Sequence, residues 1–141
     1  MSNLIRQNDV HVRVRYSETD AMGFLHHSRY FALFEVGRTE LYRVQGGDYR
    51  AMEESGLFLV VAKAECRFRS PARYDDELII RTTLSRASPA KLEHDYEVIR
   101  GGVVLATGHT VLGCVDRQGQ IQRMPDFLVD GFEVDLPRPK E

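Results

Sequence analysis

The sequence has 141 residues, of which 43% are hydrophobic and 28% charged, a balance typical of one globular domain and not of a disordered chain. Its 19 Lys and Arg residues stand against 21 Asp and Glu, so the net charge of -2 argues against a protein that coats nucleic acid. No apolar run approaches the ~20 residues needed to cross a bilayer.

The N-terminus and the cysteines favour a cytoplasmic protein. The first ten residues, MSNLIRQNDV, lack the continuous apolar stretch of a signal peptide. Cys66 and Cys114 are too few for a disulfide framework or a structural zinc site. We therefore expect one soluble domain, residues 1–141, in a reducing compartment.

Alternating apolar and polar residues predict five strands. The first places Val10, Val12, Val14 and Tyr16 on one apolar face. The other strands cover residues 57–69, 78–84, 92–98 and 103–116, and the turns between them contain Pro71, Pro89 and Gly101-Gly102. We expect the last four strands to form consecutive hairpins, with a bulge or close approach at Gly108 or Gly113.

One strong helix is predicted between the first and second strands. Apolar residues recur there at steps of three and four, namely Tyr30, Phe34, Gly37, Leu41 and Val44. The helix spans residues 28–44, with Ser28 as its N-cap and Gly46-Gly47 as its end. A short helix over 48–55 and one helical turn in the segment that starts at Pro125 are also expected.

This order of elements indicates an α+β fold. A single antiparallel sheet with one apolar helix to cover it is expected to curve around that helix. Because such a sheet leaves edges and a rim uncovered, we expect at least a dimer.

The segment from Tyr16 to Tyr30 collects titratable and flexible residues where the long helix begins. A helix start offers unpaired N–H groups that suit an oxyanion, and Glu18 and Asp20 lie just before it. A carboxylate there could activate water or attack a carbonyl. The pattern Asp-x-x-Gly is equally typical of a type I turn, so a purely structural role for Asp20 stays open.

Residues 14–43, VRYSETDAMGFLHHSRYFALFEVGRTELYR, resemble the hotdog-fold acyl-CoA thioesterases of the 4-hydroxybenzoyl-CoA thioesterase family, most of all the branch associated with Tol–Pal genes. Residues 70–78, SPARYDDEL, resemble that family's turn before the third strand. The resemblance covers nearly the whole chain. It implies the hotdog fold, a five-stranded sheet wrapped around one long helix.

The resemblance also implies roles for single residues. Asp20 matches the catalytic aspartate, as nucleophile or as general base, and His27 matches a histidine whose backbone N–H polarises the thioester carbonyl. Gly23 lets the loop approach the ligand, Tyr16 supports the aspartate, and Phe24 lines the acyl pocket. Thioester hydrolysis on this plan needs no metal or cofactor.

Cationic residues are expected to hold the phosphates of CoA. Arg69 and Arg73 flank one loop, and Arg86, Ser88 and Lys91 flank another. Solvated strand ends on an ordinary surface are an equally good interpretation of these residues.

The remaining titratable residues are interpreted as structural. His26 is expected to be structural or solvent-facing, and His94 and His109 to be satisfied core or interface residues. Cys66 and Cys114 are interpreted as small buried hydrophobes. Glu35 competes with Asp20 as the catalytic acid, but its spacing from Arg38 favours a surface ion pair.

The predicted reaction is hydrolysis of an acyl-CoA thioester, at a site shared by two subunits of a dimer or tetramer. Three alternatives stay open: an acyl-carrier-protein thioester as donor, hydration of an enoyl thioester, and a non-catalytic acyl-CoA-binding module. The first loop lacks the His-Gly-Gly pattern of hydratases, which argues against the second of these.

Overall fold

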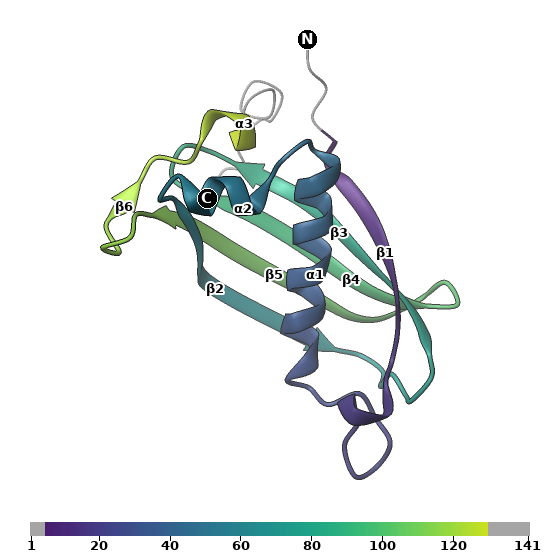
Figure 1. Cartoon of the computed structure of the whole chain (residues 1–141). Coiled ribbons are helices and arrows are strands. Elements are labelled where there is room, and N and C mark those ends of the chain that lie inside the picture. Colours follow the sequence, from purple (N-terminus) through teal and green to yellow (C-terminus); the bar gives the residue numbers. More distant parts are fainter. Residues whose placement is uncertain (1–4, 130–141) are drawn as a thin grey trace.

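An antiparallel sheet with one long helix lying across its face dominates the computed structural model, which describes residues 5–129 (Figure 1). The strands are β1 (Gln7–Arg13), β2 (Phe58–Phe68), β3 (Glu77–Ala87), β4 (Leu92–Arg100), β5 (Val103–Val115) and β6 (Ile121–Gln122). The helices are the 3₁₀ turn η1 (Tyr16–Glu18), α1 (Arg29–Val44), α2 (Tyr49–Glu54) and α3 (Asp126–Val129). The α+β hotdog arrangement expected from the sequence is confirmed. Of the expected C-terminal segment, α3 is the helical turn, and residues 130–141 lie outside the described part.

The strand order is β1-β3-β4-β5-β2, with β6 paired to β5. The prediction that the last four strands form consecutive hairpins is therefore wrong for β2, which pairs with β5 and not with β3. Residues 69–76 instead cross the end of the sheet, where Ala72 accepts a hydrogen bond from Leu25 at 2.8 Å. Alternation along one strand identifies its buried face but carries no information about its neighbour, which explains the error.

The first strand also ends earlier than predicted. β1 stops at Arg13, and after Val14 the chain turns into η1, where the Glu18 N–H donates to the Arg15 carbonyl at 3.0 Å. Val14 is buried as expected, but Tyr16 is 78% exposed, so it does not belong to the apolar face of the strand.

The helix predictions are confirmed. Ser28 occupies the N-cap position of α1, and Gly46 follows its end with a φ of 90°. The Ser28 side chain does not cap the helix backbone, which differs from the prediction. The α2 helix is capped by Asp48, whose Oδ1 accepts a hydrogen bond from the Ala51 N–H at 3.1 Å.

Two glycines let α1 lie close to the sheet. A Cβ at Gly37 would stand 2.2 Å from Thr82 Oγ1, and a Cβ at Gly108 would stand 2.3 Å from the Phe34 ring. Phe34 in turn stacks on Tyr96 with ring centroids 4.4 Å apart. The close approach expected at Gly108 is thus confirmed, whereas Gly113 has no neighbour within 4 Å of its Cβ position.

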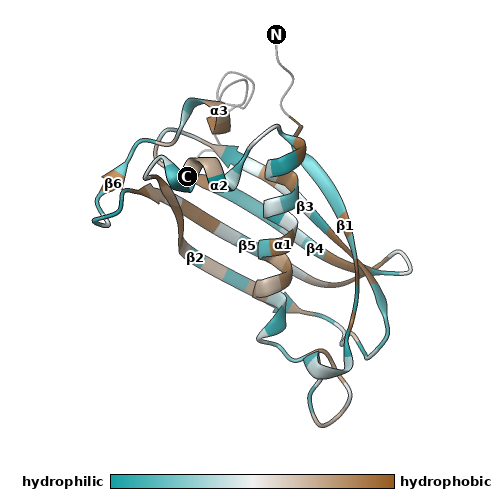
Figure 2. Ribbon diagram, viewed as in Figure 1, coloured by the Kyte–Doolittle hydropathy of each residue, from teal (hydrophilic) through white to brown (hydrophobic). Residues whose placement is uncertain are grey.

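The edge strand β2 is poorly covered. Its register with β5 puts Val61, Ala64 and Phe68 on the face that α1 covers elsewhere, yet Val61 is 50% and Phe68 53% exposed. Hydrophobic residues on β2 therefore extend beyond the helix at this side of the sheet (Figure 2). No helix among residues 5–129 has the length and apolar character needed to span a membrane.

Candidate active site

Asp20 lies in a tight hairpin between β1 and α1. Its backbone N–H donates to the Phe24 carbonyl at 2.8 Å, and its own carbonyl accepts from Gly23 at 3.0 Å. Its Oδ1 accepts two backbone hydrogen bonds, from Met22 at 2.9 Å and from Phe24 at 3.1 Å. Gly23 has a φ of 80°, which glycine adopts without strain. The turn interpretation of Asp-x-x-Gly is therefore correct.

The turn does not use the whole carboxylate. Asp20 is exposed, and among the described residues its Oδ2 accepts no hydrogen bond. The same side chain can thus order the loop through Oδ1 and present Oδ2 to a ligand. A fixed carboxylate with one free oxygen suits both a nucleophile and a general base.

The base of this hairpin is joined to the entry of α1. The His26 N–H donates to the Glu18 carbonyl at 2.8 Å, and the Arg29 N–H donates to the His26 carbonyl at 2.9 Å. Phe24 pairs with Arg73 of the crossing segment, whose guanidinium lies 4.8 Å from the centroid of the Phe24 ring. The sequence analysis did not predict this contact, because it assigned Arg73, with Arg69, to phosphate binding.

His27 is exposed at the start of α1 and stacks on His26, with ring centroids 4.3 Å apart. Its carbonyl accepts from Tyr30 at 3.3 Å, but within residues 5–129 its own backbone N–H has no hydrogen-bond acceptor. An unpaired N–H at a helix start is a donor available to an oxyanion.

His26 has a structural role, as expected, but it is half-buried rather than solvent-facing. Its Nδ1 accepts the Ser28 backbone N–H at 3.2 Å and lies 2.9 Å from Ser28 Oγ. These bonds order the first turn that leads into α1.

The two competing carboxylates are engaged elsewhere. Glu18 is 14% exposed and its Oε1 accepts the Arg15 backbone N–H at 2.8 Å, so it caps η1. Glu35 is 71% exposed and lies 3.7 Å from Arg38, which confirms the predicted surface pair. Asp20 is the carboxylate of the loop that remains accessible.

Tyr16 supports the loop in a different way than predicted. Its ring packs edge-on against Tyr74 at 5.6 Å rather than against Asp20. Its backbone carbonyl accepts hydrogen bonds from the N–H and the hydroxyl of Thr19, at 3.2 and 2.7 Å. Tyr16 therefore holds the residue before Asp20 through its main chain.

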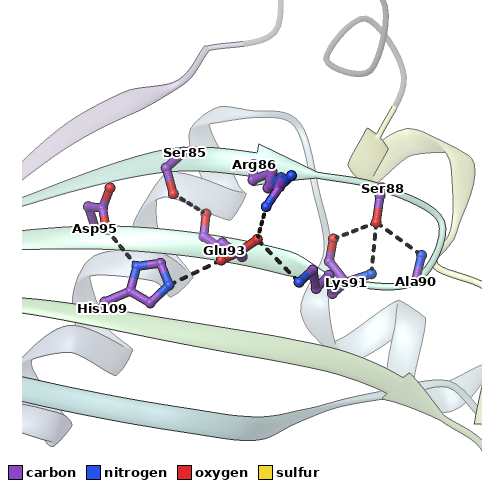
Figure 3. A network of polar contacts seen from close by, with 8 residues as sticks. All are labelled: Ser85, Arg86, Ser88, Ala90, Lys91, Glu93, Asp95 and His109. Atoms are coloured by element: carbon purple, nitrogen blue, oxygen red, sulfur yellow. Dashed lines mark hydrogen bonds and ion pairs between the residues drawn. The ribbon is translucent and has the colours of Figure 1, made fainter. Parts of the chain in front are cut away.

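The expected phosphate-binding residues fall into two groups at opposite ends of the sheet. Arg69 directly follows β2, at the end that holds the Asp20 hairpin. Arg86, Ser88 and Lys91 lie at the β3–β4 turn at the other end (Figure 3). The structure does not bring these three together with Asp20 of the same chain.

The β3–β4 cations have an acidic partner. Glu93 Oε2 lies 3.5 Å from Arg86 and 3.6 Å from Lys91. Ser88 Oγ accepts the N–H groups of Ala90 and Lys91 and so orders its own turn (Figure 3).

His109 and His94 lie on opposite faces of the sheet. The ring of His109 bridges two carboxylates, with Nδ1 2.6 Å from Asp95 and Nε2 3.2 Å from Glu93 (Figure 3). His94 is buried, and its Nδ1 has no hydrogen-bond partner among the described residues, so the expectation of a satisfied histidine is wrong there. Burial lowers the pKa of His94 to about 3.

The cysteines match their predicted role. Cys114 is buried and Cys66 half-buried, and burial raises the pKa of the Cys66 thiol to about 11. Neither thiol is suited to act as a nucleophile at neutral pH.

Comparisons with known proteins show which family the chain belongs to. The sequence profile of the thioesterase-like superfamily matches residues 14–132. The chain belongs to the thioesterase-like superfamily. The predicted enzyme class, thioester hydrolase, is thereby confirmed, and the superfamily match includes the Asp20 hairpin and α1.

Individual relatives of this thioesterase-like chain cover most of its length. The acyl-CoA thioester hydrolase YbgC of Escherichia coli is 31% identical over 86% of this chain and 92% of its own. A solved hypothetical protein from Aquifex aeolicus is 32% identical with a TM-score of 0.83, covering 87% of this chain and 97% of that one. The DHNA-CoA thioesterase of Staphylococcus aureus is 25% identical with a TM-score of 0.82, covering 91% and 85%.

Proposed function

We propose that this thioesterase-like protein hydrolyses acyl-CoA thioesters to a carboxylic acid and free CoA, with Asp20 as the reacting carboxylate. The proposal rests on the Asp20 carboxylate beside the entry of α1. Two backbone N–H groups hold its Oδ1, while its Oδ2 accepts no hydrogen bond among the described residues. A thioester suits such a site because its carbonyl is weakly stabilised by resonance and its thiolate leaves easily.

Two reaction mechanisms are compatible with this arrangement of atoms. As a nucleophile, Oδ2 attacks the thioester carbon, the C–S bond breaks and CoA thiolate leaves; water then cleaves the mixed anhydride and restores the carboxylate. As a base, Oδ2 takes a proton from the attacking water. In both routes the carbonyl oxygen gains negative charge, which the His27 N–H and the positive end of α1 stabilise.

We propose that a second copy of the chain completes the site. Asp20 and His27 are exposed. Within residues 5–129 the outer edge of β2 pairs with no other strand, and its apolar side chains lie on an uncovered face. Pairing at this edge buries Val61, Ala64 and Phe68, and places a neighbouring subunit beside the start of α1.

The cationic residues then divide between subunits. Arg69 is proposed to contact the phosphates of a CoA bound at Asp20 of its own chain. Arg86, Ser88 and Lys91 are proposed to serve CoA bound to another protomer, because they lie at the far end of the sheet from their own Asp20. We also propose that the chain belongs to the Tol–Pal-associated branch of the family, because residues 14–43 resemble that branch. A cytoplasmic location is proposed from composition alone.

The test measures thiol release from a panel of acyl-CoA thioesters by wild type, Asp20→Asn and Glu35→Gln. An asparagine retains the Oδ1 acceptor of the turn but cannot act as nucleophile or base, so the rate falls by at least about 100-fold. Glu35→Gln is the matched control, since that side chain is exposed and paired only with Arg38 among the described residues. An undiminished rate in Asp20→Asn would overturn the assigned role.

The alternatives give different results in the same assay. A hydratase changes the absorbance of an enoyl-CoA without releasing thiol. A non-catalytic module binds acyl-CoA and releases none. A carrier-protein thioesterase releases thiol faster from acyl carrier protein than from CoA.

A further inference from the structure

A cavity of about 20 Å³ lies between the second half of α1 and the sheet, at the opposite end of the helix from the Asp20 hairpin (Figure 1). Five leucines line it, one each from β2, β3, β4, β5 and α3. The rest of its wall is polar and consists of Arg38, Tyr42, Gln45, Tyr49 and His94. Residues from every layer of the fold therefore surround a space that is only partly apolar.

Two of these polar residues are buried and carry atoms without a partner. His94 is 6% exposed and Tyr42 is 4% exposed. Neither His94 Nδ1 nor the Tyr42 hydroxyl makes a hydrogen bond within residues 5–129. Because a buried polar atom without a hydrogen bond destabilises the folded state, two of them at one cavity indicate an occupant that bonds to both.

Thr82 Oγ1 is also buried without a partner among the described residues, but its surroundings differ. It faces α1 at Gly37, where a Cβ would stand only 2.2 Å from it, and Thr82 does not line the cavity. The helix backbone lies against this hydroxyl and leaves no room for a molecule between them. Only the two atoms at the cavity therefore have space beside them for a ligand.

The volume of the cavity matches a single water molecule. One water needs ~10–15 Å³ and two to four polar partners, and a cavity of about 20 Å³ satisfies the first condition without room for a larger molecule. His94 Nδ1 and the Tyr42 hydroxyl supply two partners. Because water both donates and accepts hydrogen bonds, it suits either tautomer of the imidazole.

A small anion is the alternative occupant, since the wall contains the cationic Arg38. The Arg38 side chain is 12% exposed, and its guanidinium already lies 3.7 Å from the Glu35 carboxylate. Half of the lining residues are leucines, among which an anion without its hydration shell is poorly stabilised. The composition of the wall therefore favours a neutral ligand.

We propose that this cavity binds one internal water molecule, which forms hydrogen bonds with His94 Nδ1 and the Tyr42 hydroxyl. Tyr42 belongs to α1 and His94 to β4, so the water links the helix to the sheet. This link holds the second half of α1 in place, far from the Asp20 hairpin at its start. The water site is independent of the proposed reaction.

Oxygen-17 relaxation dispersion of the solvent tests the proposal, because it counts long-lived bound waters and does not detect exchanging protons. Tyr42→Phe, which keeps the ring, and His94→Leu each remove one of the two partners, and we expect each variant to hold one long-lived water fewer than wild type. Thr82→Val is the matched control, since it removes a buried hydroxyl that does not line the cavity, and it should keep the wild-type number. Equal numbers in all four proteins would overturn the proposal.

A crystal structure of wild type grown in sodium bromide separates water from an anion. Electron density in the cavity without anomalous signal, within hydrogen-bond distance of His94 Nδ1 and the Tyr42 hydroxyl, supports the proposal. An anomalous bromide peak at that place contradicts it. A cavity without density, in which the His94 ring bonds to a protein group, contradicts it as well.

Discussion

The backbone N–H of His26 lies 2.8 Å from the carbonyl oxygen of Glu18, and this bond closes the Asp20 hairpin against the residue that precedes His27. The carboxylate and the free N–H at the helix start thus belong to one hydrogen-bonded unit. Their relative position does not depend on a flexible linker, which is what a preorganised site requires.

The hairpin depends on the Asp20 side chain for its own stability. Asp20→Ala removes the acceptor of two backbone bonds, and we expect it to lower the free energy of unfolding by about 1–2 kcal/mol. Asp20→Asn keeps an acceptor and should cost clearly less. Urea unfolding of both variants measures the difference, and equal losses would contradict a role for Oδ1 in the turn.

Gly108 is expected to tolerate no side chain. In Gly108→Ala the new Cβ meets the Phe34 ring, so the free energy of unfolding should fall by about 1–3 kcal/mol. Gly113→Ala, in the same strand, meets nothing within 4 Å and serves as the control. Equal stability of the two variants in thermal unfolding would show that α1 does not approach the sheet this closely.

His94 makes stability depend on pH. Burial, followed in size by the charge of Arg38, lowers its pKa to about 3, whereas the unfolded chain has an ordinary histidine. Below that ordinary pKa the unfolded state binds a proton that the folded state does not, so stability falls as the pH falls. Between pH 7.5 and 5.5 the loss is about 1.4 kcal/mol.

The variant His94→Leu removes this proton while filling a similar volume. The difference in unfolding free energy between wild type and His94→Leu should therefore change by about 1.4 kcal/mol between pH 7.5 and 5.5. Urea titrations at the two pH values measure it. A constant difference would mean that His94 has the same pKa in the folded and the unfolded protein.

The uncovered edge of the sheet predicts a change of assembly on substitution. Ala64→Arg puts a charge on the apolar face of β2, and we expect sedimentation analysis to shift from dimer to monomer. Ile121→Arg, which changes an 88% exposed residue on β6, should leave the mass unchanged. A wild-type monomer, or a dimer that survives Ala64→Arg, would contradict pairing at β2.

The sequence predicted local features more accurately than spatial neighbours. The period of Tyr30, Phe34 and Leu41 identified the buried face of α1, because helical spacing is a local property. The partner of β2 was missed because nothing within residues 58–68 specifies β5 rather than β3. The path of residues 69–76 across the end of the sheet decides which strand pairs with β2.

The same distinction holds for the candidate site. Asp20 and Gly23 form a turn that sequence alone suggests, and their spacing fixes its geometry. Lys91 and Arg69 were grouped by chemistry, yet they lie at opposite ends of the sheet, which composition cannot show.

The path of residues 69–76 across the sheet has a consequence for synthesis on the ribosome. Phe58–Phe68 is made well before Val103–Val115, the strand it must pair with, and the two hairpins β3–β4 and β4–β5 intervene. Until translation passes residue 115, the apolar strand β2 has no native strand to pair with. The nascent chain is therefore most vulnerable to aggregation over this interval, and the last main-sheet pairing to form is that of β2, the strand at which we propose a second copy to pair.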